Sequence, residues 1–153
     1  MKHILTCSFG KDSIATALLA LQHGEPLDEL VYSEVMFSDT VSGELPEHKR
    51  FIYETAIPYF EKRGIPTRVL RGQKTYLDCF YHIVSRGNAE GKLASFPLTG
   101  RCSIQRDCKL PPIRNYQKTL PQDTVYYLAL PPMNRYGWHG LRKTKHLCWQ
   151  SIT

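Results

Sequence analysis

The 153-residue chain lacks any apolar run as long as a membrane-spanning helix, which takes about 20 consecutive apolar residues. Its first residues also lack the apolar segment and small-residue cleavage site of a secretory signal peptide, because a strand-like pattern starts directly after Met1. Five cysteines, an odd number without a regular framework, argue against a disulfide-stapled secreted domain. We therefore expect a cytoplasmic protein with reduced thiols and no membrane partner.

The cysteines and histidines also lack the spacing of a metal centre. The two closest cysteines are separated by five residues, whereas zinc and iron–sulfur ligands typically recur as Cys-x-x-Cys. Cys7 and Cys79 stand among apolar residues and are expected to pack in the core. None of the six histidines is spaced from a carboxylate so as to form a ligand pair, so His48 and His82 are expected at the surface or in packing. The cysteines and histidines therefore predict neither a metal site nor an iron–sulfur cluster.

Acidic residues are in the minority, with 14 Asp and Glu against 20 Lys and Arg, which gives a formal net charge of +6. A basic balance favours an anionic partner such as a nucleotide or a nucleic acid. The apolar fraction of 42% is normal for a globular protein, so the chain has the size and composition of one ordinary domain with a hydrophobic core.

Short apolar runs alternate with amphipathic segments along residues 3–128. Strands are expected at 3–8, 30–37, 67–70 and 124–128, and helices at 12–22, 46–63, 75–85 and 111–117. Gly24 and Gly64 are the expected ends of the first two helices, and Pro58 should bend the second. Because alternating strands and helices build parallel sheets, we expect one α/β domain over residues 1–128, with an open, mostly parallel sheet and helices on both faces.

The segment Ser8-Phe9-Gly10-Lys11-Asp12-Ser13 joins the first expected strand to the first expected helix. Such a junction presents unpaired backbone N–H groups at the positive end of the helix dipole, which suits an anion. Gly10 lets a ligand approach the backbone, and the two serines add hydroxyl donors. Lys11 brings a positive charge, whereas Asp12 can cap the helix. A glycine turn before a capped helix without a ligand would show the same pattern, and this alternative stays open.

The same segment closely resembles the PP-loop, Ser-Gly-Gly-x-Asp-Ser, of the ATP-pyrophosphatase superfamily, and within it the branch of phosphoadenosine phosphosulfate (PAPS) reductases. Phe9 departs from that pattern, which usually has a second glycine at this position. The resemblance implies the Rossmann-like adenine nucleotide alpha hydrolase fold, with ATP or a PAPS-like nucleotide bound at residues 8–13. The segment is not a Walker A loop, because the GxxxxGK[ST] spacing is absent.

A second block resembles the family's DTG…E.PE segment and reads Phe37-Ser38-Asp39-Thr40, then Glu44-Leu45-Pro46-Glu47. The resemblance implies that Val35 to Phe37 line the adenine with backbone groups. Asp39 and Thr40 follow a strand end and are candidates to hold ribose or Mg²⁺. Glu44 and Glu47, at the start of the next helix, also fit as plain complements of the helix dipole.

A third block resembles the family's R.CT…LK..P segment and reads Gly100-Arg101-Cys102-Ser103, then Cys108-Lys109-Leu110-Pro111-Pro112-Ile113. The resemblance implies that Arg101 and Lys109 bind the anionic group of the substrate. PAPS reductases also depend on a cysteine in a C-terminal Glu-Cys-Gly-Leu-His segment, and Cys148, the only late cysteine, does not match it. A reductase would therefore lack its nucleophile here.

Residues 129–153 depart from the family pattern, which continues with Gly-Ile-Ala-x-Asp-Glu-x-x-Arg where this chain has Ala129-Leu130-Pro131-Pro132-Met133-Asn134-Arg135. Deleting one G from the codons TTG GGC ATT GCC GCC GAT GAA CCG turns the family-like reading into residues 128–135 of this chain. We therefore interpret residues 129–153 as an out-of-frame tail without the acids that serve the site, which the gene sequence across these codons tests. The alternative is a genuine, divergent tail whose cationic and aromatic residues suit RNA.

These motifs predict a protein that binds ATP or a related adenine nucleotide and catalyses cleavage or transfer at its α-phosphate, as a transferase does. Lys11, Asp12 and Asp39 are the candidate catalytic residues, Mg²⁺ is a fitting cofactor, and the acceptor stays open among RNA, DNA and a sulfur donor. A sulfonucleotide reductase and a non-catalytic nucleotide- or nucleic-acid-binding module are the alternatives, and a homo-oligomer is compatible with the sequence. An out-of-frame tail would put the activity of this chain in doubt.

Overall fold

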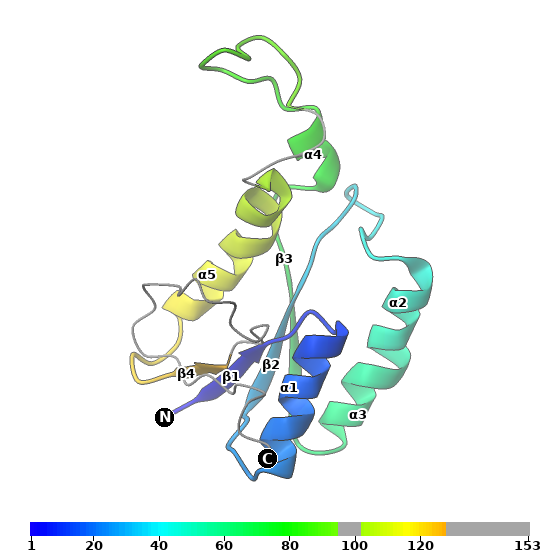
Figure 1. The fold of residues 1–153 in the computed structure, drawn as a ribbon, viewed down its shortest axis with the longest axis vertical. Coiled ribbons are helices and arrows are strands. Elements are labelled where there is room, and N and C mark those ends of the chain that lie inside the picture. The colour runs from blue at the N-terminus through cyan, green and yellow to red at the C-terminus, as the bar shows by residue number, and fades with distance from the viewer. Residues whose placement is uncertain (95–101, 128–153) are drawn as a thin grey trace, which may run out of the picture. The chain divides into compact units, whose positions relative to one another are not determined.

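A computed structural model describes residues 1–94 and 102–127 (Figure 1). Its elements follow in the order β1 (His3–Thr6), α1 (Lys11–Gln22), β2 (Glu29–Glu34), α2 (Pro46–Arg50), η1 (Phe51–Ala56), α3 (Ile57–Glu61), β3 (Thr67–Arg71), α4 (Tyr76–Phe80), η2 (Gln105–Lys109), α5 (Leu110–Lys118) and β4 (Val125–Tyr127). The elements η1 and η2 are π-helical. The described residues divide into two compact units, the first with residues 1–32, 51–68 and 120–127, and the second with residues 33–50, 69–94 and 102–119.

The four strands form one open, parallel sheet in the order β3-β2-β1-β4. In β1, Ile4 lies opposite Glu29 of β2 and opposite Tyr126 of β4, and both pairings are parallel. Ile4 and Leu5 are each 1% exposed, as expected for a strand inside a parallel sheet. The expected α/β class with a parallel sheet is thus confirmed. Among residues 1–94 and 102–127, no helix is long and apolar enough to cross a membrane.

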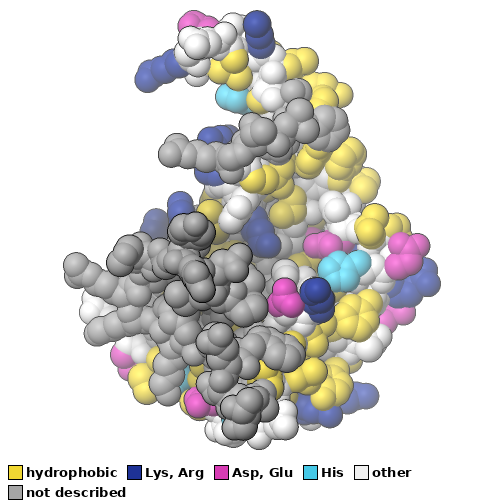
Figure 2. Space-filling view, viewed as in Figure 1, with side chains coloured by type: hydrophobic (Ala, Val, Ile, Leu, Met, Phe, Trp, Pro, Cys, Tyr) yellow, Lys and Arg dark blue, Asp and Glu magenta, His cyan; other side chains and the backbone are white. Residues whose placement is uncertain are grey.

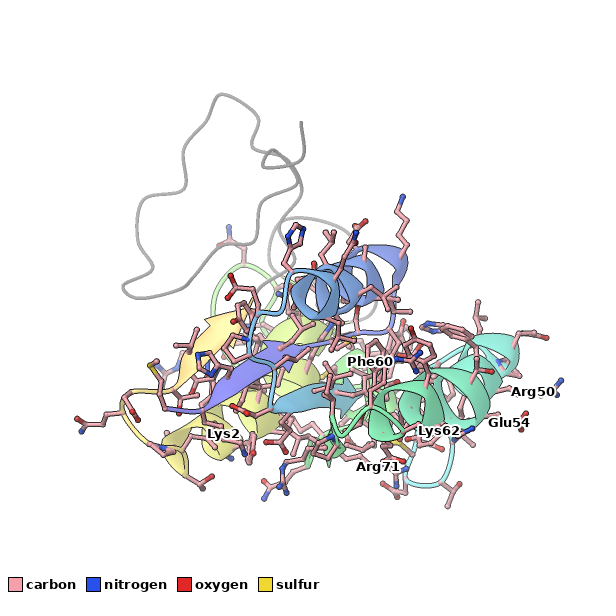
Figure 3. The ribbon with its side chains drawn as sticks, turned by 90° about the horizontal axis from the view of Figure 1, so that it is seen from below. Lys2, Arg50, Glu54, Phe60, Lys62 and Arg71 are labelled. Carbon is pink, nitrogen blue, oxygen red and sulfur yellow. The ribbon has the colours of Figure 1, made fainter. Side chains whose placement is uncertain are left out.

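In the first unit, α1 lies against one face of the strands (Figures 1 and 3). The residues that it buries are small, with Thr16, Ala17 and Ala20 all nearly inaccessible, so the helix axis can come close to the strands. The helix ends at Gln22, and Gly24 follows with φ +66°, a left-handed conformation that glycine adopts without strain. The expected end of this helix is confirmed.

The expected helix over residues 46–63 is helical from 46 to 61, but its middle third, η1, is π-helical. In the first unit, η1 and α3 bury a row of apolar residues four positions apart, Ile52, Ala56 and Phe60. Figure 3 shows Phe60 pointing inward, whereas Glu54 and Lys62 point away from the unit. Pro58 has no N–H to donate, and the wide turns of η1 directly precede it, where an α-helical turn would clash with its ring.

Glu29 is a buried carboxylate in the first unit, with 3% of its surface exposed. Its oxygens accept hydrogen bonds from the Lys2 ammonium and from Arg68 Nε, the latter at 2.6 Å. A buried charge is tolerated only when it is paired in this way, so Lys2 and Arg68 allow an acid at the start of a central strand.

In the second unit, α4 is shorter than the helix expected at 75–85. Thr75 caps its start, because the Thr75 hydroxyl accepts from Asp78 N while the Asp78 carboxylate accepts from Thr75 N at 2.7 Å. These hydrogen bonds, that of the Thr75 amide first, lower the pKa of Asp78. The helix ends at Phe80, and residues 82–94 form a turn-rich arm in which Ile83 pairs with Leu93 (Figure 1).

Helical structure in the second unit also starts earlier than the expected residue 111. The π-helical η2 occupies Gln105–Lys109, where no helix was expected, and runs directly into α5. Gly72, just after β3, packs on this element, because a Cβ at Gly72 would collide with the carbonyl group of Cys108. The early start therefore brings η2 against the end of β3.

Candidate functional site

The loop after β1, residues 8–13, contains Phe9, whose backbone dihedral φ is positive. Phe9 has φ +56°, a left-handed conformation that costs a bulky residue roughly 1–2 kcal/mol. Its ring is 2% exposed and meets the Tyr32 ring edge-to-face at 5.4 Å. The phenylalanine thus adopts a conformation typical of glycine, the residue usual in the PP-loop, while its buried ring holds the loop to the unit.

The two serine hydroxyls of this loop converge on its turn. Ser8 Oγ and Ser13 Oγ lie 3.3 Å apart, and Gly10 N donates to Ser8 Oγ at 3.4 Å. Ser13 Oγ in turn donates to the Gly10 carbonyl at 3.0 Å. Ser8 is exposed and Ser13 is buried, so one hydroxyl lies at the surface of the loop and the other at its buried base.

The first turn of α1 has no side-chain cap. Gly10 is the N-cap residue with an extended backbone, and the amides of Lys11, Asp12 and Ser13 donate to none of the described residues. The expectation that Asp12 caps this helix is wrong, because Asp12 lies inside the first turn, where it complements the dipole. The Lys11 and Asp12 side chains are both exposed. Three donor groups at the positive end of a 12-residue helix can bind an anion.

Cys7, just before this loop, is 1% exposed, which confirms it as a core residue. Burial raises the pKa of its thiol, although Ser13 and the Phe9 amide act in the opposite direction. Its described contacts, with Phe9 and Ser13, include no second thiol, and Cys7 therefore acts as a packing group.

In the second unit, residues 35–43 fold back on themselves after β2. Gly43 N donates to the Val35 carbonyl and Phe37 N to the Val41 carbonyl, both at 2.8 Å. Asp39 and Thr40 occupy the exposed tip. The tip can present a carboxylate and a hydroxyl to a ligand or to Mg²⁺, which prefers oxygen ligands.

The backbone groups that the resemblance assigns to adenine already make hydrogen bonds inside the second unit. Tyr76 N donates to the Met36 carbonyl at 2.8 Å, and Leu77 N donates to the Phe37 carbonyl at 3.1 Å. A base would have to use the second lone pair of these oxygens or the side chains. The Phe37 ring is 42% exposed and stacks on Tyr76 at 5.5 Å, and Figure 2 shows hydrophobic side chains gathered at the surface over α4.

Glu34, the last residue of β2, is completely buried in the second unit. Its Oε2 accepts from Arg71 Nε at 2.9 Å and lies 2.8 Å from Arg71 Nη2. Its Oε1 accepts from Ser42 Oγ at 2.7 Å and lies 3.6 Å from Lys49 Nζ. One carboxylate therefore joins the end of β3, the 35–43 segment and α2. The sequence analysis did not identify this carboxylate as a site of ion pairing. A signal was present, because β3 carries Arg68 and Arg71 and β2 has a glutamate at each end.

The third sequence block is described only in part. Arg101 lies outside the described residues, and so does the tail over 129–153. Lys109 is half-buried at the end of η2, where its carbonyl accepts from Ser33 Oγ at 3.1 Å. Cys79 is a core residue as expected, but its partner was missed: its sulfur lies 3.4 Å from that of Cys108.

Two histidines lie beside carboxylates. His48 Nδ1 lies 2.8 Å from Glu44 Oε2, four residues earlier, and His3 Nδ1 lies 3.5 Å from Asp28 Oδ2. Neither pair gathers a third ligand, since no group of three or more His, Cys, Asp or Glu among the described residues could hold a metal ion. Glu47 lies in the first turn of α2, as a dipole complement does.

A hollow of about 630 Å³ lies in the second unit beside β3 and α5. Apolar Leu70, Pro111 and Pro112 line it together with two cations, Arg71 and Lys74. Arg71 is held by Glu34, and Lys74 Nζ lies 4.0 Å from a carboxylate oxygen of Asp107. The hollow thus carries little uncompensated charge and is the weaker candidate for an anion.

The sequence-predicted residues fall into separate groups. Residues 8–13 come together in the first unit, whereas Val35, Phe37, Asp39, Thr40 and Lys109 belong to the second. Comparisons of the chain with protein-family models, with curated proteins and with solved structures gave no match.

Proposed function

We propose that the chain binds ATP or a related adenine nucleotide through the loop of residues 8–13, as a member of the PP-loop superfamily with its doubly wound fold. The observation that carries the proposal is the uncapped first turn of α1, where three consecutive amides point out beside the hydroxyls of Ser8 and Ser13. Phosphate oxygens are the acceptors that such a turn suits, because they are anionic and each takes several hydrogen bonds. The alternative, in which residues 8–13 are only a glycine turn before a capped helix, is disfavoured because no side chain caps α1.

In this proposal, the loop amides and the Lys11 ammonium hold the phosphates and stabilise the charge that develops during cleavage at the α-phosphate. Such a transfer depends on position and electrostatics more than on a protein nucleophile. Asp12, in the first turn of α1, is the acid beside this loop that would hold Mg²⁺, and the metal would supply positive charge to neutralise the phosphates. The resemblance separately assigns Asp39 and Thr40, in the second unit, to Mg²⁺ or the ribose, and Lys109 and Arg101 to the anionic group of the substrate. A soluble, cytoplasmic setting with an RNA, DNA or sulfur-donor acceptor fits the same proposal.

Two alternative functions are a non-catalytic nucleotide-binding module and a sulfonucleotide reductase. A non-catalytic nucleotide-binding module needs the loop but not the strand-end acids, and an out-of-frame tail would leave such a module. A sulfonucleotide reductase needs an accessible cysteine nucleophile. Among the described cysteines only Cys102 is exposed, and it does not stand in the family's reductase segment, so this alternative is the weaker one.

The test is ATP titration by calorimetry with and without Mg²⁺. Lys11→Ala should weaken binding roughly tenfold, because it removes a charged partner of the phosphates. Lys62→Ala, which removes another exposed charge from the first unit at the end of α3, is the matched control and should leave the affinity unchanged. Asp12→Ala should weaken binding when Mg²⁺ is present. Without the metal the same substitution should not weaken binding and should strengthen it slightly, because the carboxylate alone repels phosphate.

Gly10→Ala tests the close approach of the backbone to the ligand. Gly10 has φ −73°, and a Cβ there would meet only Ser8 Oγ at 3.5 Å, so the fold accepts alanine. A bound phosphate would leave less room, and we expect weaker ATP binding at unchanged stability. If Lys11→Ala and Asp12→Ala both bind ATP as the unaltered chain does, the loop is not the nucleotide site.

A further inference from the structure

Two cysteines 29 positions apart meet inside the second unit. Cys79 lies in α4 and Cys108 in η2, and their Sγ atoms are 3.4 Å apart. Cys79 is 4% exposed and Cys108 is 1% exposed, and both are free thiols. A disulfide needs its sulfurs about 2.05 Å apart, so an approach of roughly 1.4 Å would join them.

The hydrogen bonds of the pair assign its two protons. Cys108 Sγ donates to the Thr75 carbonyl at 3.4 Å, so the proton shared between the sulfurs comes from Cys79. Burial, then the neighbouring Cys79 thiol, raises the pKa of Cys108 to about 12. Cys108 therefore keeps its proton, and Cys79 is the thiol better placed to react first.

We propose that Cys79 and Cys108 are a redox modification site, a dithiol that hydrogen peroxide converts into a disulfide. Neither partner belongs to the loop of residues 8–13, so the proposal stands apart from nucleotide binding. The other described cysteines give no such pair. Cys7 makes its described contacts with Phe9 and Ser13, and the exposed Cys102 accepts from the Gln105 amide.

The reaction balances with peroxide as the oxidant. The Cys79 sulfur, after losing its proton, attacks one peroxide oxygen; the O–O bond breaks, hydroxide leaves, and a sulfenic acid forms. The Cys108 sulfur then attacks the sulfenic sulfur, the S–S bond forms, and the leaving hydroxide takes the Cys108 proton as water. Two thiols and one peroxide give one disulfide and two waters, with each sulfur oxidised by one electron.

The bond would act on α4. The first amides of α4, at Tyr76 and Leu77, donate to the Met36 and Phe37 carbonyls. A disulfide from α4 to η2 would fix the helix that holds this segment, and it would also close a long loop in the unfolded chain. We expect the oxidised protein to melt at a higher temperature and to exchange the Tyr76 and Leu77 amide hydrogens more slowly.

The test is peroxide titration of the reduced, folded, full-length chain, followed by thiol blocking with N-ethylmaleimide and peptide mapping by mass spectrometry. We expect a crosslinked peptide pair holding Cys79 and Cys108, lighter by two hydrogens, as the main disulfide. Cys102→Ser should leave its yield unchanged. Cys108→Ser should abolish it and leave a Cys79 sulfenic acid that a 1,3-dione traps.

The wild-type map decides the matter even if a variant misfolds. If both thiols remain free after a dose that oxidises Cys102 completely, the proposal is wrong. It is also wrong if Cys79 and Cys108 pair with other cysteines as often as with each other. The same titration in denaturant gives the statistical pairing against which the native selectivity is measured.

Discussion

Replacing Arg71 by methionine should destabilise the protein more than replacing Glu34 by glutamine, although the two residues form one ion pair. The reason lies in their burial. Glu34 is fully buried, whereas the Arg71 side chain is 56% exposed and that of Lys49 is 42% exposed. When Glu34 loses its charge, the two cations can turn to water. When Arg71 is lost, the carboxylate stays buried without its main partner.

The magnitudes follow from these two situations. Glu34→Gln keeps an oxygen for the Ser42 hydroxyl and loses charged hydrogen bonds, a loss of about 1.5–3 kcal/mol. Arg71→Met leaves a buried, poorly compensated carboxylate, which costs about 3–5 kcal/mol. The double variant Glu34→Gln/Arg71→Met should be more stable than Arg71→Met alone, because it no longer buries the negative charge of Glu34.

Urea unfolding followed by circular dichroism measures all three variants, with the midpoint and the slope fitted together. Arg106→Met is the matched control, since Arg106 is 63% exposed and pairs with Asp107 at the surface of the second unit, so its loss should cost less than about 1 kcal/mol. Equal losses in Glu34→Gln and Arg71→Met, or a double variant weaker than Arg71→Met, would refute the reasoning.

Three further predictions concern single positions. Phe9→Gly relieves the backbone at φ +56° but empties a buried aromatic site, so a net loss of about 2–3 kcal/mol is expected in urea unfolding; a gain would mean that strain outweighs packing. Gly72→Ala should cost about 1–3 kcal/mol in the same assay because its Cβ meets the Cys108 carbonyl, whereas Gly10→Ala should change stability by less than about 0.5 kcal/mol. The Cys108 thiol has a pKa of about 12 in the folded chain against 9.0 in the unfolded one, so the unfolded state alone releases this proton between those values. Relative to Cys108→Ser, wild-type stability should therefore fall as pH rises through the range between these two values, and parallel pH curves would contradict this.

The sequence predicted the strands and the long helices well because their apolar residues repeat at the periods of buried elements. The first helix and Gly24 are the clearest case, since the pattern and its glycine stop agree. The helix at 75–85 was drawn too long because Tyr81 and Ile83 continue an apolar pattern, yet both are more than half exposed in the structure. Apolar periodicity indicates burial only where a partner element is present.

The candidate site was predictable only where its residues are close together in the sequence. The loop of residues 8–13 is contiguous, so its composition was enough to single it out. Glu34 with Arg71, and Cys79 with Cys108, are joined by the fold across 37 and 29 positions, and a single sequence carries no such distances. The π-helical η1 and η2 have the same origin, because packing partners and the proline rather than propensity select the wider turn.

During synthesis, β1 leaves the ribosome long before β4, the strand that pairs with one of its edges. About 120 residues lie between β1 and β4, so roughly 6–24 s of synthesis separate the two at ordinary rates. Throughout that time one row of β1 backbone donors and acceptors has no β4 to pair with, in a strand that carries the apolar side chains of Ile4 and Leu5. Products that stop before Val125 would keep this edge of β1 unpaired, and we expect them to be prone to aggregate.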